Sequence, residues 1–253
     1  MKINYSRDRK KPWLGTLLRW KKILNYEYDR GGDFIKPQYL IEQIDQLVDK
    51  NRTIITTDVG SHQMWTAQFY RCMSPGTFLT SGGMGTMGFG LPAAIGAYYA
   101  RPEFNVINIT GDGSFQMNIQ ELATIRQYDI PVKVFVLTNG TLGLVKQFQD
   151  MKFGSRYTST ILNFNPDFSE VARAYDIEGM RIEKRREVRE AIRFALDFKG
   201  PIVVDFKIDP SEKVYPILMG GKRLDEQIDC HNDVAKRIEK DWKERLHELS
   251  LTK

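Results

Sequence analysis

Apolar runs alternate with amphipathic stretches between residues 36 and 208. Short runs rich in β-branched residues predict buried strands. Apolar residues that recur at helical spacing predict helices with one packed face. Strands are predicted at 53–58, 106–110, 132–137 and 202–208, and helices at 36–50, 91–100, 114–128, 168–175 and 186–198. The alternation predicts an α/β fold in which a parallel sheet is flanked by helices on both faces.

The two ends of the chain depart from this pattern and suggest three parts. Residues 1–32 form a basic and apolar N-terminal arm, 33–210 the α/β domain, and 211–253 a C-terminal tail with a helix at 234–249. No stretch is apolar for long enough to span a bilayer, so no membrane association is expected. The N-terminus also has no apolar leader, so secretion is not indicated.

The positive charge of the chain is confined to the arm. The net charge is +5, but residues 1–30 carry nine Lys or Arg and three Asp or Glu, so the rest of the chain sums to −1. Trp13, Leu14 and Trp20 interleave with these charges, which favours packing on a partner protein over binding nucleic acid. The two cysteines, Cys72 and Cys230, are too few for a disulfide framework. We therefore expect a protein of a reducing compartment, in the cytoplasm.

Two oxygen-bearing side chains follow neighbouring predicted strands. Asp112, within Gly-Asp-Gly, comes directly after the strand at 106–110, and Asn139 follows the strand at 132–137. In a parallel sheet both lie at the carboxyl edge, where ligands bind. Their oxygens suit Mg²⁺, and the first N–H groups of the helix predicted from Ser114 suit a phosphate. The pattern indicates a metal-bridged diphosphate site, although Gly-Asp-Gly alone is also typical of a tight turn.

Longer motifs then add a family resemblance. The sequence GDGS at 111–114, about 25 intervening residues and Asn139 resemble the thiamine-diphosphate (ThDP) motif, with Thr138 in place of a usual Asn. The sequences TDVGSHQMW at 57–65 and TSGGMGTMGFGLPAA at 80–94 resemble the large catalytic subunit of acetolactate synthase, also called acetohydroxyacid synthase. The similarity runs from about Trp20 to about Asp229.

The resemblance implies a set of residues for ThDP and Mg²⁺. The metal ligands would be Asp112, Asn139 and the main-chain carbonyl of Thr141. His62 would contact a phosphate or an intermediate, unless it is simply a hydrogen-bonded core histidine. Ser61 stands where the family has Gln, and Met87 would lie beneath the cofactor unless it only fills the core. The cofactor-binding residues implied are Val59, Gly60, Ser61, His62, Gly85, Met87, Gly111, Asp112, Gly113, Ser114, Asn139, Thr141, Leu142, Gly143 and Leu144.

The same resemblance implies the reaction. The family joins pyruvate to a second 2-oxoacid in the biosynthesis of the branched-chain amino acids isoleucine and valine. Val145 and Phe148 would line the acceptor pocket, and Phe148 stands where the family commonly has Trp.

The matching residues cover only the pyrophosphate-binding domain. The family's pyrimidine-binding domain carries the glutamate that activates ThDP, and its middle domain binds FAD. Only about 30 residues precede the first predicted helix. We therefore expect a partner chain to bring the pyrimidine domain, and FAD only if that chain also brings the middle domain. On this view the chain supplies no catalytic residue and is inactive alone.

Other partners and other readings stay open at this stage. Homo-oligomers and a regulatory small subunit are compatible with the resemblance. An open half-site would also expose Met84, Met87 and Leu144 to a partner. The alternatives are a non-catalytic truncated remnant, or a subunit of another ThDP-dependent 2-oxoacid enzyme, such as a 2-oxoacid:ferredoxin oxidoreductase. The latter commonly brings cysteines for a cluster, which this sequence lacks.

Overall fold

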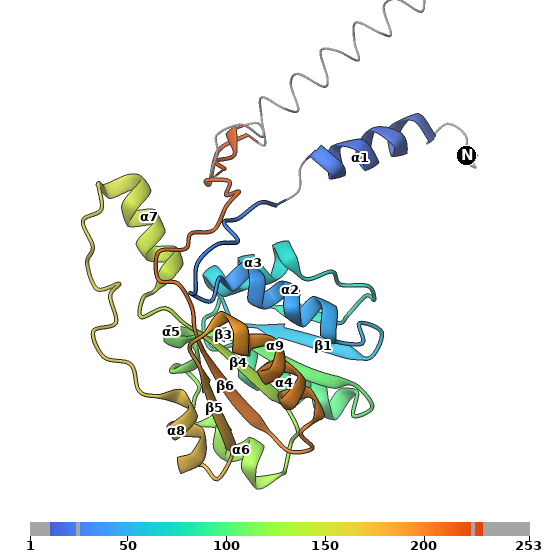
Figure 1. Cartoon of the computed structure of the whole chain (residues 1–253), viewed down its shortest axis with the longest axis vertical. Helices are drawn as coiled ribbons and strands as arrows, with labels where there is room; N and C mark the ends of the chain where they lie inside the picture. Colours follow the sequence, from blue (N-terminus) through green and yellow to red (C-terminus); the bar gives the residue numbers. More distant parts are fainter. Residues whose placement is uncertain (1–10, 24–25, 224–225, 230–253) are drawn as a thin grey trace, which may run out of the picture. The chain divides into compact units, whose positions relative to one another are not determined.

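The computed structural model describes residues 11–23, 26–223 and 226–229 (Figure 1). One compact unit spans Asp29–Val214, and a second comprises residues 1–28 and 215–253. The second unit contains helix α1 (Lys11–Ile23), which was not predicted, and an antiparallel bridge between Ile217 and Ile228. The helix predicted at 234–249 lies outside the described residues. No helix in the described ranges is long and apolar enough to cross a bilayer.

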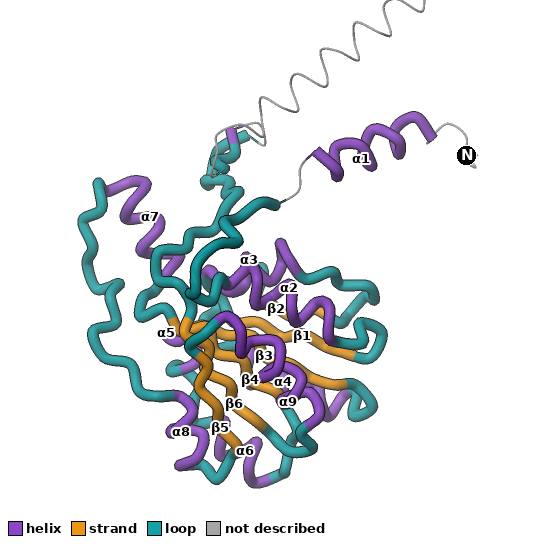
Figure 2. Tube along the Cα trace, in the orientation of Figure 1, coloured by secondary structure: helices purple, strands orange, loops and turns teal. Residues whose placement is uncertain are grey.

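Six parallel strands form one sheet in the larger unit (Figure 2). They run in the order β2-β1-β3-β4-β6-β5, and every neighbouring pair is parallel. This arrangement confirms the predicted fold class. The strands are β1 (Thr53–Thr57), β2 (Phe78–Thr80), β3 (Asn105–Gly111), β4 (Lys133–Thr138), β5 (Glu178–Ile182) and β6 (Ile202–Lys207).

Helices cover both faces of this sheet. They are α2 (Pro37–Leu47), α3 (Ser61–Phe69), α4 (Gly90–Ala100), α5 (Asp112–Phe115), α6 (Glu121–Gln127), α7 (Gly143–Phe153), α8 (Phe168–Ala174) and α9 (Val188–Asp197), the last preceded by a 3₁₀ turn at Arg185–Glu187. Helices α3 and α7 and strands β2 and β5 were not predicted.

The helix predicted at 114–128 is wrong, because two short helices occupy this segment. Between α5 and α6 the chain makes i→i+3 hydrogen bonds, such as Met117 N–H to the Ser114 carbonyl. Asn118 sits in this turn and donates its side-chain amide to the Gly88 carbonyl at 2.6 Å. A polar side chain that bonds outside the helix in this way competes with helical propagation.

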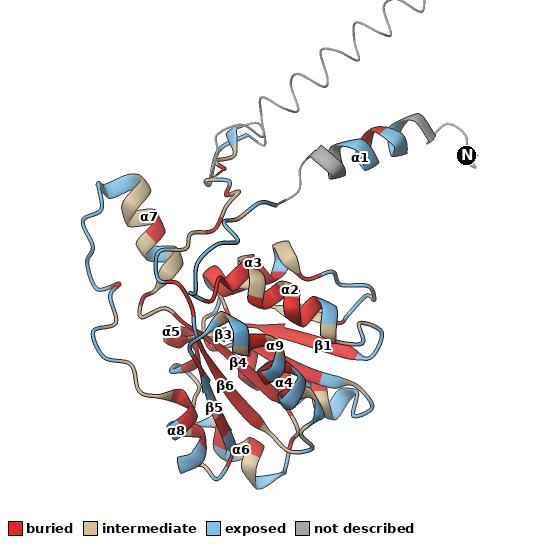
Figure 3. Ribbon diagram, in the orientation of Figure 1, coloured by how far each residue is buried: buried red, intermediate tan, exposed pale blue. Residues whose placement is uncertain are grey.

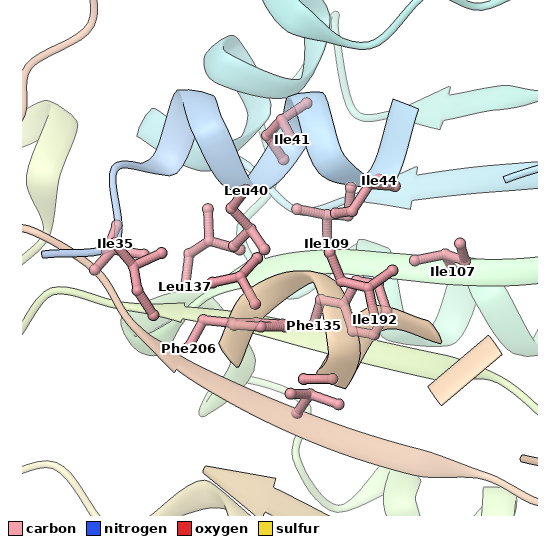
Figure 4. Packing of buried hydrophobic residues seen from close by; sticks show 14 of the residues in the cluster. Ile35, Leu40, Ile41, Ile44, Ile107, Ile109, Phe135, Leu137, Ile192 and Phe206 are labelled. Carbon is pink, nitrogen blue, oxygen red and sulfur yellow. The ribbon is translucent and has the colours of Figure 1, made fainter. Parts of the chain in front are cut away.

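The core lies on both faces of the sheet, whose four inner strands, β1, β3, β4 and β6, are buried almost throughout (Figure 3). On one face α2, α3 and α9 pack on alternate strand residues such as Phe135 and Leu137 (Figure 4). On the other face α4, α6 and α8 pack on the intervening residues, such as Val134 and Val136. Because both faces are covered, every position of β4 is buried, which explains the apolar run at 134–137.

The order of the strands creates a crevice at the carboxyl edge. From β1 the chain passes to β2 on one side, whereas from β3 it passes to β4 on the other. The connections therefore diverge between β1 and β3. In open α/β sheets ligands bind at such a switch point.

Candidate functional site

A pocket lies at this switch point and is built from the loops that follow β1, β3 and β4. It encloses about 50 Å³. Of the predicted site residues, Gly85 and Phe148 do not line it. Trp65 and Leu137 line it without having been predicted. The lining residues are Val59, Gly60, Ser61, His62, Trp65, Met87, Gly111, Asp112, Gly113, Ser114, Leu137, Asn139, Thr141, Leu142, Gly143, Leu144 and Val145.

Three helices begin at this pocket. Helix α3 starts at Ser61, α5 at Asp112 and α7 at Gly143, and the first residues of each line the pocket. None of the three N-termini has a side-chain cap. Uncapped N-termini present backbone N–H groups and a partial positive charge, which together favour an anion. The long helix predicted from Ser114 is therefore absent, and the first residues of α3, α5 and α7 line the pocket instead.

Asp112 is held at the centre of the pocket by backbone and side-chain donors. Its Oδ1 accepts the Gly113 N–H at 3.0 Å, and its Oδ2 accepts the Gly140 N–H at 2.7 Å and the Asn165 amide at 2.8 Å. The pairing of Gly111 with Leu137 aligns the ends of β3 and β4, so the turn after β4 comes up against Asp112. Gly140 has a φ of +70° in this turn, a conformation that favours glycine.

The charge of this carboxylate is costly in the metal-free protein. Burial raises the pKa of Asp112 to about 6, and the nearby Asp205 carboxylate adds to the rise. The bonds from Gly140, Gly113 and Asn165 act in the opposite direction but do not cancel it. A cation beside Asp112 would relieve this cost.

Asn139 and Thr141 provide the other oxygens that were predicted to bind a metal. The Asn139 Oδ1 accepts the Thr141 N–H at 3.0 Å, and the buried Thr141 hydroxyl has no hydrogen-bond partner in the structure. The described part of the chain contains no cluster of three His, Cys, Asp or Glu residues that could hold a metal. One carboxylate with amide and carbonyl oxygens instead fits Mg²⁺, which keeps waters and substrate phosphates as further ligands.

His62 is buried and incompletely bonded. It is 4% exposed, and its Nε2 has no hydrogen-bond partner in the structure. A Cβ added at Gly111 would lie 2.8 Å from His62 Nδ1, so the glycine allows the ring to pack against β3. Burial lowers the pKa of His62 to about 3, against a hydrogen bond with the Asp58 backbone. The ring is therefore neutral at physiological pH, and the open nitrogen does not match a fully bonded core histidine.

We expect the His62→Gln variant to resist acid better than the wild type. The folded-state pKa of His62 lies below its ordinary value of 6.5, so the unfolded chain binds the proton first as the pH falls. Between pH 6.5 and about pH 3, this histidine therefore lowers the free energy of unfolding by about 1.4 kcal/mol for each unit that the pH falls. Urea unfolding of both proteins at several pH values measures the difference. A difference that stays constant from neutral pH to about pH 4 would contradict this assignment.

The apolar residues that were expected to be exposed differ in the exposed fraction of their side chains. Met84 is 91% exposed, whereas Met87 and Leu144 are partly exposed and line the pocket. Val145, at the start of α7, is 45% exposed and lines the pocket. The open apolar surface beside the pocket thus includes Met84 and Val145.

Asn165 is a contact of the site that sequence reasoning missed. It lies in the loop before α8, 53 positions after Asp112, and bonds to both Asp112 and Gln116. No local pattern in the sequence points to it. Trp65 could have been found, since it ends the TDVGSHQMW stretch and lies one helical turn after His62.

These features define an α/β domain with a pocket at the carboxyl edge of its parallel sheet. Residues 58–206 match the family described as "Thiamine pyrophosphate enzyme, C-terminal TPP binding domain". This match covers more than half of the chain, and the chain belongs to this family.

The chain is also similar to acetolactate synthases. It is 44% identical over 220 residues to the mitochondrial acetolactate synthase of Schizosaccharomyces pombe. The aligned region covers 85% of this chain and 33% of that protein. It is 39% identical over 250 residues to the probable acetolactate synthase large subunit of Methanococcus aeolicus. Here the aligned region covers 93% of this chain and 42% of that protein. The chain thus spans about a third to two fifths of the length of these curated relatives.

Proposed function

We propose that this chain provides the diphosphate- and metal-binding half of an acetolactate synthase. The observation that supports this most is the convergence of the uncapped N-termini of α3 and α7 on one pocket beside Asp112. The partial positive charges suit a diphosphate, and the buried carboxylate suits the cation that accompanies it. The similarity to acetolactate synthases supports the reaction class.

In this proposal each part of the pocket has a separate task. Asp112, Asn139 and the Thr141 carbonyl hold Mg²⁺, and residues 59–62 and 111–114 surround the diphosphate. Met87 and Leu144 contact the cofactor's thiazolium ring, while Gly85, in an exposed turn with φ +67°, presents its backbone to the pyrimidine ring. When bound, ThDP supplies the electron sink that allows a 2-oxoacid to lose CO₂ and join a second one. The chain itself binds, orients and excludes water.

The proposal includes a partner that brings the activating glutamate. Asp112 is the carboxylate among the residues that line the pocket, and it is committed to the metal. The glutamate would come from a pyrimidine-binding domain outside this sequence, on a partner chain, with FAD bound if a middle domain is present. A second copy of the chain or a regulatory subunit would add to this assembly. The intact set of Asp112 and Asn139 favours this function over a remnant that has lost its cofactor.

Calorimetric titration with ThDP tests the binding half of the proposal. The chain should bind ThDP measurably when Mg²⁺ is present and lose this binding when EDTA removes the metal. Equal heats in both conditions would contradict a metal-bridged diphosphate.

The Phe148→Trp variant is expected to change the choice of acceptor. Phe148 lies on α7 three residues after Val145, so the two side chains share one side of the helix. The larger aromatic ring should add apolar contact to the extra methylene of 2-oxobutyrate and so favour it over pyruvate by roughly tenfold, since one methylene in an apolar pocket is worth about 1–3 kcal/mol. The ratio of aceto-hydroxybutyrate to acetolactate formed by the complemented enzyme, with both acceptors present, measures it. Phe153→Trp, at the exposed end of α7, is the matched control. A ratio that changes equally in both variants would place Phe148 outside the proposed acceptor pocket.

A further inference from the structure

A second cavity lies at the opposite, amino edge of the sheet. It has a volume of about 180 Å³. Its walls come from the amino ends of β3 and β4, from α4, and from the end of α9 with the loop that follows it. The residues that line it are Tyr98, Phe104, Asn105, Val106, Pro131, Lys133, Leu196, Phe198 and Lys199. None of them belongs to the cofactor pocket.

A buried ammonium group forms part of this wall. Lys133 is 5% exposed, and its Nζ donates to the carbonyls of Phe198 and Gly200, each at 2.7 Å. The same Nζ lies 5.7 Å from the centre of the Phe198 ring. An ammonium has three N–H donors, so two carbonyls leave one unassigned. In the part of the chain that the structure describes, Lys133 forms no ion pair.

A second cation makes the cavity more positive. Lys199 is exposed at its rim, and the lining includes no carboxylate. Burial, and then the charge of Lys199, lower the pKa of Lys133 to about 8. The nearby Arg101 lies over the Phe104 ring and is already paired with Glu103 at 2.6 Å. An anion in the cavity would therefore relieve the repulsion between the two lysines.

The remaining walls are apolar and partly aromatic. Tyr98, Phe104 and Phe198 supply rings, and Val106, Pro131 and Leu196 supply aliphatic surface. An apolar cavity of about 150 Å³ is large enough for benzene. A space of 180 Å³ thus suits a body of that size with a small charged group attached.

We propose that this cavity binds a small monocarboxylate with an apolar or aromatic body, whose carboxylate lies between Lys133 and Lys199. The arrangement selects against ligands that carry an ammonium group, because no acidic side chain lines the cavity to receive one. Amino acids are therefore poor ligands, whereas the corresponding carboxylic acids fit. This site is independent of ThDP and of the function proposed for the carboxyl edge.

Benzoate is a suitable probe, with benzylamine and phenylalanine as comparisons of similar size. Each is titrated into the ¹⁵N-labelled full chain without ThDP, and amide resonances are followed. Benzoate should cause saturable shifts at residues 104–106, 133 and 196–199, whereas benzylamine and phenylalanine should cause none there. Absence of saturation by benzoate below about 10 mM, or equal binding of benzylamine, would overturn the proposal.

Variants separate an anion site from a simple apolar hole. Lys199→Gln removes an exposed charge without touching the core, and should weaken benzoate binding about two- to fivefold. Leu196→Trp should fill the cavity and abolish binding, while Lys184→Gln, an exposed lysine outside the cavity, should leave it unchanged. Lys133 also caps backbone carbonyls, so its removal risks the fold. For Lys133 the readout is instead an upward shift of its side-chain pKa when benzoate binds. Unchanged affinity in Lys199→Gln together with an unchanged Lys133 pKa would refute the carboxylate assignment.

Discussion

Replacing Asp112 by Asn is expected to abolish Mg²⁺-dependent ThDP binding and to stabilise the metal-free chain at neutral pH. The first effect follows from the proposed role of the carboxylate, because a neutral amide oxygen cannot replace the charge that a divalent cation needs. The second follows from its burial: Asp112 is 1% exposed, and its pKa is raised to about 6. The residue would thus cost stability in order to bind metal.

The direction of the stability change follows from proton binding. The folded-state pKa of Asp112 exceeds its ordinary value of 3.8, so the folded chain holds this proton more tightly than the unfolded chain. Stability is therefore lost as the pH rises from about 4 to about 6, by at most about 3 kcal/mol. Asn is not ionised and retains an oxygen for the Gly140 N–H. We expect Asp112→Asn to gain on the order of 1–3 kcal/mol at pH 7 and nothing at pH 4.

Two further variants make this experiment specific. Asp112→Ala should also lose cofactor binding with the fold largely intact. However, it leaves the Gly140 N–H and the Asn165 amide without their acceptor, so it should be less stable than Asp112→Asn. Asp197→Asn changes an exposed carboxylate and should alter neither property. Calorimetry with ThDP and Mg²⁺ and urea unfolding at pH 4 and 7 provide the readouts. Unchanged cofactor affinity in Asp112→Asn would refute the metal assignment.

The strands that could be predicted from the sequence are the buried ones, because burial on both faces favours runs of apolar residues. Strands β3, β4 and β6 are covered on both faces, so nearly every position is buried and most buried positions carry β-branched or other apolar residues. Strand β5 lies at the edge of the sheet and alternates exposed and buried residues over only five positions, including a glycine. It therefore gave no such signal. The helix predicted at 114–128 was wrong because Asn118 bonds to Gly88, a residue 30 positions away, which a local pattern cannot show.

The residues of the candidate site also fall into two groups, those that local sequence patterns predicted and those that only the structure revealed. Residues in the loops directly after β1, β3 and β4 were predicted, because they follow strand ends and carry local motifs. Asn165 reaches Asp112 across 53 positions of sequence, and Asp205 influences its pKa from β6. Both effects depend on tertiary packing. The motif thus predicted the candidate ligands, whereas the structure was needed to show which residues hold Asp112 and shift its pKa.

The 253-residue chain by itself should form no acetolactate, and a chain that carries a pyrimidine-binding domain should restore this activity. The pocket encloses about 50 Å³, whereas sites that enclose a small-molecule ligand measure about 300–1,000 Å³. The chain thus surrounds only part of a cofactor. Weak ThDP binding is expected for the same reason, because a site that encloses only part of a ligand leaves the rest of it in water.

The residues that line the pocket also lead us to expect an inactive chain, whatever the volume of the pocket. Activation of ThDP requires an acid–base group at the pyrimidine ring, and the neutral His62 lies in the segment that faces the diphosphate in our proposal. Asp112, the carboxylate in the pocket lining, would be bound to the metal. No lining residue in the described ranges is therefore placed to do this work. Robust acetolactate formation by the isolated chain would contradict the proposed division of the site.

The complementation experiment can use the part of the Schizosaccharomyces pombe acetolactate synthase that this chain does not match, produced as a separate chain. Neither chain should be active alone, and the mixture should form acetolactate from pyruvate in the presence of ThDP, Mg²⁺ and FAD. Asp112→Asn in this chain should abolish activity in the mixture without preventing association, as measured by gel filtration. A third outcome combines three observations: the chains associate, the mixture is inactive, and this chain still binds ThDP with Mg²⁺. In that case the site would hold the cofactor without catalysing carboligation. That combination would favour a cofactor-binding remnant, since binding would persist where the reaction does not.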